Sequence, residues 1–163
     1  APIVTITSPA NGAQFIQGET VLAGWSTSDA LSGLASTSAP TPNGQPIDTA
    51  VAGAKTFTVV SPDLAGNVTS VANTYTVLSP AQAIQGLIAT VKSLNLPKGT
   101  ENSLTSKLDS AFASLQKGQN NAAINQLNAF MNEVNAQRGK ALTNEQANTL
   151  IQMAQKIIAA ITG

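Results

Sequence analysis

The period of the residue pattern changes near the bond between Ser79 and Pro80. Before this bond, runs such as IVTIT, TVLAGWST, KTFTVV and NTYTV alternate in near period two and are rich in Val, Ile, Thr and aromatic residues. This pattern is typical of β-strands. After it, apolar residues recur every three or four positions, as on one face of an α-helix. We therefore expect two domains, at residues 1–78 and 79–163.

The first domain alternates strand-like runs with segments that form turns. Seven of the eight prolines precede residue 81, and the turn segments PANG, PNG and DLAGN separate the runs. Several short strands with turn signals every 8–12 residues or so predict an antiparallel β-sandwich. Trp25 lies within one alternating run, so we expect its indole ring to pack in the core between the sheets.

The second domain carries four amphipathic segments with start and stop signals. Ser79 and Thr143 are each followed three residues later by a glutamine, which predicts two capping boxes. We expect Thr100 to cap the second helix, and Gly118 and Gly139 to end the second and third helices. Four such helices with short links predict a small antiparallel four-helix bundle. The expected fold class is thus a β-sandwich followed by an α-helical bundle.

The composition removes the commonest catalytic machinery. The chain has no histidine and no cysteine, which excludes Ser-His-Asp and Cys-His arrangements as well as thiolate metal sites. No spacing singles out a pair of carboxylates, so we expect no enzymatic activity, with a small enzyme based on Asp or Glu as the weaker alternative. Only 10% of residues are charged, against about 25% in ordinary globular domains, and such a composition is common among secreted bacterial proteins.

The charge and hydropathy patterns argue against two kinds of partner. Residues 80–163 hold seven basic and four acidic groups, a net of +3 that includes one arginine and no basic run. Nucleic acid binding requires a stronger basic footprint, so we expect none. No apolar run reaches the roughly 18 residues of a membrane-spanning helix, so we expect no membrane insertion. The first residues lack a basic leader segment, which favours a mature or excised fragment.

Two acidic turns offer a candidate metal site. Asp63 and Asn67 lie in DLAGN, and Asp29 lies in the segment SDALSG. Their oxygens suit Ca²⁺, but calcium requires six to eight oxygen ligands and the first domain holds only four scattered acids. The alternative is a plain turn, in which Asp63 accepts backbone hydrogen bonds and Gly66 takes a positive φ. We favour the turn and otherwise expect no cofactor.

Two features are candidates for contact with a ligand. Tyr75, with Trp25, is one of the few large rings, and its side chain is either buried or available to a sugar. On the third helix, Asn128, Asn132 and Asn135 share a face directed away from the apolar stripe. These amides either order the loop around Arg138 by capping backbone groups or present donors and acceptors to a sugar or protein. We favour the first interpretation.

The first domain carries four further motifs: P-x-V-x-I-x-x-P at the start, NGAQF, WSTSDALSGL, and SPDLAGNVTS before TYTV. On these motifs, residues 1–78 resemble the bacterial immunoglobulin-like modules of secreted enzymes and surface proteins. The resemblance implies a sandwich that acts as a spacer, an adhesion element or a ligand-binding platform. It also raises a minor alternative from related surface domains, a cross-link between Lys55 and Asn67 beside Asp29 or Asp63.

Three segments of the helical half form a further pattern: NSLTSKLDSA, the long stretch AINQLNAFMNEVNAQRGKALTNEQANTLI and the apolar AQKIIAAI. On these segments, the helical half resembles the FIMAH domain, found at the C-terminal ends of multidomain extracellular bacterial proteins, including hydrolases. The resemblance implies an extracellular, noncatalytic accessory region in which the sandwich is a spacer and the bundle a targeting or docking module. Its partners would be other domains of the parent polypeptide. The alternative is a carbohydrate- or cell-wall-binding module, with a polysaccharide or cell-wall surface as the partner.

Overall fold

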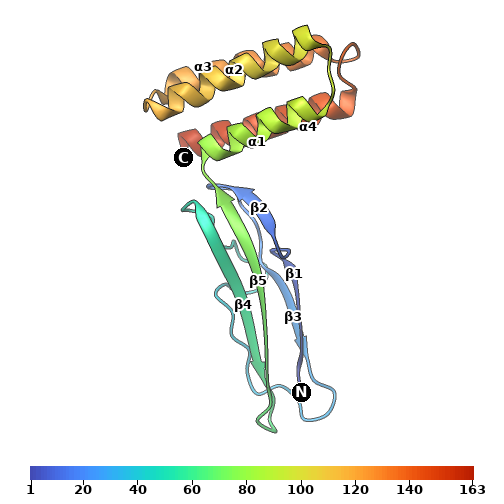
Figure 1. Cartoon of the computed structure of the whole chain (residues 1–163). Helices are drawn as coiled ribbons and strands as arrows, with labels where there is room; N and C mark the ends of the chain where they lie inside the picture. The colour runs from blue at the N-terminus through green and yellow to red at the C-terminus, as the bar shows by residue number, and fades with distance from the viewer. The chain divides into compact units, whose positions relative to one another are not determined.

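The structure, a computed structural model, describes residues 1–163 and divides into two compact units. We call Ala1–Val77 the β unit and Leu78–Gly163 the helical unit. Figure 1 shows their elements in chain order. The strands are β1 (Ile3–Ser8), β2 (Ala13–Ile16), β3 (Gly24–Ser28), β4 (Gly53–Pro62) and β5 (Val68–Leu78). The helices are α1 (Pro80–Ser93), α2 (Lys98–Gln116), α3 (Asn120–Gln137) and α4 (Asn144–Thr162).

The β-sandwich prediction is wrong. The β unit has two small sheets, one of two strands in the order β1-β3 and one of three strands in the order β2-β5-β4. Between β3 and β4 the backbone makes only isolated bridges and no strand. This segment contains Pro40, Pro42 and Pro46, and because proline cannot donate to a strand ladder, it interrupts the pairing that further strands would need.

The longest ladder of the β unit joins β4 to β5. These strands pair antiparallel without a break from Gly53 opposite Val77 to Pro62 opposite Val68. Their inward residues supply most of a buried cluster: Ala23, Ile47, Phe57, Val59, Tyr75 and Val77. Trp25 is only partly buried against this cluster, and its Nε1 donates to the carbonyl oxygen of Thr41 at 3.2 Å. The indole ring therefore lies at the border of the core.

The two capping boxes predicted for the helical unit are present. The side chains of Ser79 and Thr143 accept the backbone N–H of Gln82 and Gln146, and each glutamine side chain bonds back to the cap residue. The expected cap at Thr100 is wrong, because α2 begins at Lys98, directly after its N-cap Pro97. Proline fixes its own φ and thereby starts a helix without a side-chain cap.

The four helices pack around one apolar core. α1 and α3 each contact α2 and α4, which fits the helical half of the fold prediction. The core of this unit consists of fully buried residues, among them Ile84, Leu87, Leu104, Leu108, Leu127, Phe130, Leu142, Leu150 and Ile157. Gly118 and Gly139 follow α2 and α3 with φ of 69° and 72°, the left-handed conformation that glycine adopts without strain.

Candidate functional site

The structure brings Asp29 and Asp63 together at the start of the chain. The ammonium group of Ala1 lies 3.4 Å from Oδ2 of Asp29 and 3.6 Å from Oδ2 of Asp63. The two acidic side chains are only 1% and 0% exposed. Two carboxylates this close and this sheltered repel each other, and the ammonium group offsets that repulsion.

Each of the two carboxylates also organises its own turn. Oδ1 of Asp29 accepts the backbone N–H of Leu31, Ser32 and Gly33. The bond from Ser32 contributes most to holding the pKa of Asp29 below its ordinary value. Asp63 accepts the side-chain amide and the backbone N–H of Asn67, both at 2.8 Å. The side-chain bond from Asn67 contributes most to lowering the pKa of Asp63, which falls to about 2.

The three residues of the candidate calcium site are therefore neighbours. Asp29, Asp63 and Asn67 meet through the bonds described above, and Gly66 takes the positive φ of 84° that the turn interpretation requires. The chain nevertheless has no place where three or more acidic side chains gather. Since calcium needs six to eight oxygens, backbone or water oxygens would have to complete its coordination. The plain turn stays the prediction for this segment, and calcium binding stays its untested alternative.

Tyr75 belongs to the core of the β unit. Its side chain is 4% exposed, its ring meets Phe15 edge-on at 5.9 Å between centroids, and its hydroxyl donates to the carbonyl oxygen of Asp48 at 2.8 Å. Burial raises the pKa of its hydroxyl. The ring has no exposed face to offer a sugar. Lys55 pairs with Asp48 at 2.5 Å, so its ammonium group is engaged with that carboxylate and not with Asn67.

The turn after α3 is organised by Arg138. Its guanidinium donates to Oδ1 of Asn148 at 2.7 Å and to Oδ1 of Asn135 at 3.1 Å, and also to the carbonyl oxygen of Asn144. These bonds join the end of α3 to the first two turns of α4. Among the three predicted asparagines, only Asn135 therefore acts as part of the scaffold.

Asn128 and Asn132 lie exposed on α3, and their side chains make no hydrogen bond within the chain. The structure adds two residues that the sequence prediction omitted, Asn121 and Asn125, which are exposed on the same face of the helix. Their signal was present in the sequence, because they precede Asn128 at intervals of four and three residues. Extending the helical period back to the start of α3 would have found them.

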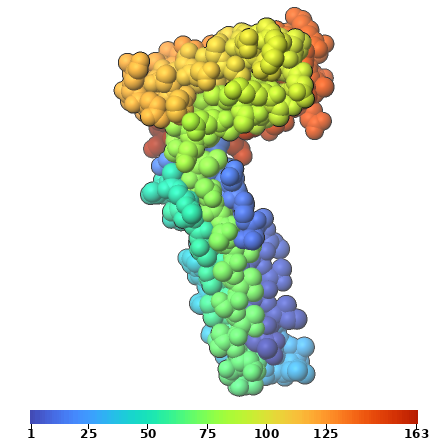
Figure 2. All heavy atoms as spheres, viewed as in Figure 1, coloured from blue at the N-terminus to red at the C-terminus, as the bar shows by residue number.

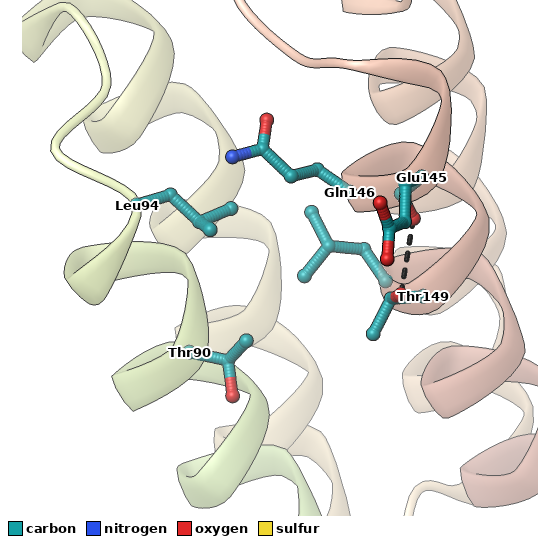
Figure 3. Close-up of a pocket in the computed structure, with 6 residues that line it drawn as sticks. Thr90, Leu94, Glu145, Gln146 and Thr149 are labelled. Carbon is teal, nitrogen blue, oxygen red and sulfur yellow. Dashed lines mark hydrogen bonds between the residues drawn. The ribbon is translucent and has the colours of Figure 1, made fainter.

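A small cavity lies between the end of α1 and the start of α4 (Figure 3). It has a volume of about 200 Å³ and is lined by Thr90, Leu94, Glu145, Gln146, Thr149 and Leu150. Its volume is below the roughly 300–1,000 Å³ of typical small-molecule sites. The hydroxyl of Thr149 donates to the backbone carbonyl of Glu145. The Glu145 carboxylate is the only charged group of the lining.

The chain thus combines a small β unit with a compact unit of four helices. The model of the FIMAH domain matches residues 81–159, almost the whole of the helical unit. FIMAH domains are helical domains of bacterial surface proteins. No family model matches the β unit, so the immunoglobulin-like resemblance finds no support there. No curated protein and no solved structure matches the chain. None of its helices is long and apolar enough to span a bilayer.

Proposed function

We propose that the chain is a noncatalytic accessory region from a larger secreted or surface-attached bacterial protein, such as an extracellular hydrolase. In this proposal the helical unit is a targeting or docking module at the C-terminal end of the parent, and the β unit is a spacer. The observation that carries it is the FIMAH match over residues 81–159, which coincides with a compact unit.

The engagement of the acidic residues supports the noncatalytic part of the proposal. Asp29 and Asp63 accept the hydrogen bonds that hold their turns, and Asp48, Glu101 and Glu133 are paired with lysines. The pKa values of four of these carboxylates are lowered further from neutral pH, which makes them poor general acids and bases: Asp29, Asp48, Asp63 and Glu133. Asp109 and Glu145 lie exposed on separate helices without a charged partner, so they do not form a catalytic pair.

The proposal is tested by mixing the full chain with intact bacterial cells and with isolated cell walls. We expect the chain to sediment with one of them and to release no soluble product. Asp109→Asn and Glu145→Gln change the two acids that lack partners. Turnover that one of these substitutions abolishes would refute the noncatalytic assignment, and failure to sediment with either surface would refute the targeting role.

A further inference from the structure

Five asparagines form a continuous line along the exposed face of α3. They follow one another at intervals of four, three, four and three residues, and all are exposed: Asn121, Asn125, Asn128, Asn132 and Asn135. We call them the asparagine stripe. With about 3.6 residues per turn and 1.5 Å per residue, the stripe stays on one face over about 21 Å. The buried residues of α3 occupy the opposite face: Ala123, Leu127, Phe130 and Val134.

Local structure accounts for only one member of the stripe. Asn135 accepts a hydrogen bond from Arg138, whereas the side chains of the other four make none within the chain. None of them caps α3 either, because the N-cap is Gln119 and it makes no side-chain cap bond. The four other carboxamides are thus exposed to solvent, and their donors and acceptors make no hydrogen bond within the chain.

Solvation alone does not explain the choice of asparagine. Gln is a better helix former than Asn and carries the same amide group. The exposed face of α4 uses Gln152 and Gln155, so the chain solvates another helix of the same unit with the more favourable residue. On α3, asparagine recurs at every exposed turn although it weakens the helix. Asparagine at these exposed positions gives up helix stability, and no contact inside the chain requires it at four of the five.

The chemistry of the stripe limits what it can contact. Glu133 is the only charged residue of α3, and it is bonded to Lys107 and Ser103 of α2. A neutral face offers nothing to a nucleic acid or an anionic membrane. The stripe has no aromatic or large apolar side chain, which the core of a protein–protein interface requires. Each carboxamide supplies two donors and one acceptor, a pattern complementary to hydroxyl groups.

We propose that the asparagine stripe binds a neutral, hydroxyl-rich polysaccharide chain that lies along α3. This inference rests on the proposed targeting function and names its partner. The α2–α3 turn is at the yellow-orange end of the helical unit in Figure 2. At this turn, an open hollow of about 510 Å³ is lined by Gly118, Gln119, Asn120, Asn121 and Ala122. It extends the polar surface beyond the first residue of the stripe, and its lining is uncharged as well.

The test measures retention of the full chain on three insoluble neutral polysaccharides (cellulose, chitin and granular starch) and on soluble anionic polygalacturonate. The test variant carries Asn→Ala at positions 121, 125, 128 and 132 and keeps Asn135 for Arg138. The matched control carries Gln152→Ala and Gln155→Ala, which remove exposed carboxamides from α4. We expect retention on at least one neutral matrix at both low and high sodium chloride. It should be lost in the test variant, kept in the control, and weakened roughly two- to tenfold by Asn128→Ala alone.

Thermal unfolding of the same variants separates binding from folding, since the test variant should be no less stable than the parent chain. The proposal is overturned by absence of retention on all three neutral matrices, or by equal retention of the test variant. It is also overturned if only polygalacturonate binds and salt abolishes that binding. Concentration-dependent self-association that disappears in the test variant, without glycan retention, would assign the stripe to a second copy of the chain. If cell walls retain the chain while neutral polysaccharides do not, the targeting function stands and this inference fails.

Discussion

Removing the asparagines from the middle of α3 should stabilise the helical unit. Asn125, Asn128 and Asn132 are exposed, lie inside the helix and make no side-chain hydrogen bond within the chain. The triple Asn→Ala variant therefore loses no contact and gains helix propensity. Ala is better than Asn by about 0.5–0.7 kcal/mol per residue, and the three effects should add to about 1.5–2 kcal/mol because no partner is shared.

In a unit of this size, 1 kcal/mol shifts the unfolding midpoint by about 4–8 °C. The expected rise for the triple variant is therefore about 6–16 °C, measured by circular dichroism at a wavelength that reports helix. Asn135→Ala is the internal control, because it also removes an acceptor of Arg138 and should give a smaller gain or a loss. An unchanged or lowered midpoint in the triple variant would refute the reasoning, because it would mean that these amides already stabilise the fold.

Three further predictions concern the rest of the chain. Phe130→Ala empties a fully buried position and should cost about 3–5 kcal/mol in denaturant unfolding; a loss below 1 kcal/mol or so would contradict the central place of this ring. Burial raises the pKa of Glu133, but the bonds from Lys107 and Ser103 outweigh it and lower the pKa overall. Lys107→Met should therefore cost about 1–2 kcal/mol above pH 4.5 or so, with the deficit shrinking as the pH falls below that value; a deficit independent of pH would refute the pairing. The pKa of Asp63 is lowered from 3.8 to about 2, so its stabilising effect is complete above pH 3.8 and is lost as the pH falls through about 2. Asp63→Asn should flatten the stability profile across that interval, and an acid limb identical to that of the parent chain would show that Asp63 does not titrate there.

The helical unit could be predicted from sequence because its signals are local. Ser79 and Thr143 act within three residues of themselves, and both capping boxes form as predicted. Gly118 and Gly139 follow their helices closely and take the positive φ that glycine adopts without strain. The prediction of a cap at Thr100 failed because Pro97 occupies the N-cap position three residues earlier. The exact ends of helices are the least certain part of such a prediction, because two start signals can lie within a few residues of each other.

The β unit was harder to predict because strand pairing depends on residues far apart in the chain. The runs around β4 and β5 were found, yet β2 was missed, since four residues are too few to show a period. The spacing of strand-like runs and turns predicted a sandwich, but three prolines between β3 and β4 prevent a continuous ladder there. Asp29 and Asp63 are 34 positions apart, so only folding could show that both reach the ammonium group of Ala1.

The short side chain of asparagine is itself an argument for recognition along α3. Binding requires each contacting side chain to be ordered, and the entropy lost grows with the number of rotatable bonds. Asn has one such bond fewer than Gln, so a stripe of asparagines presents the same amide groups at a lower ordering cost on association. The folded chain bears the opposite cost, because Asn is the poorer helix former. The exposed glutamines of α4 favour the stability of their helix, whereas the stripe on α3 gives up stability for amides held close to a rigid backbone. Giving up helix stability for a lower ordering cost is favourable only where a partner is bound. We therefore expect this unit to act through the asparagine stripe, more than through the acidic turns or the small cavity.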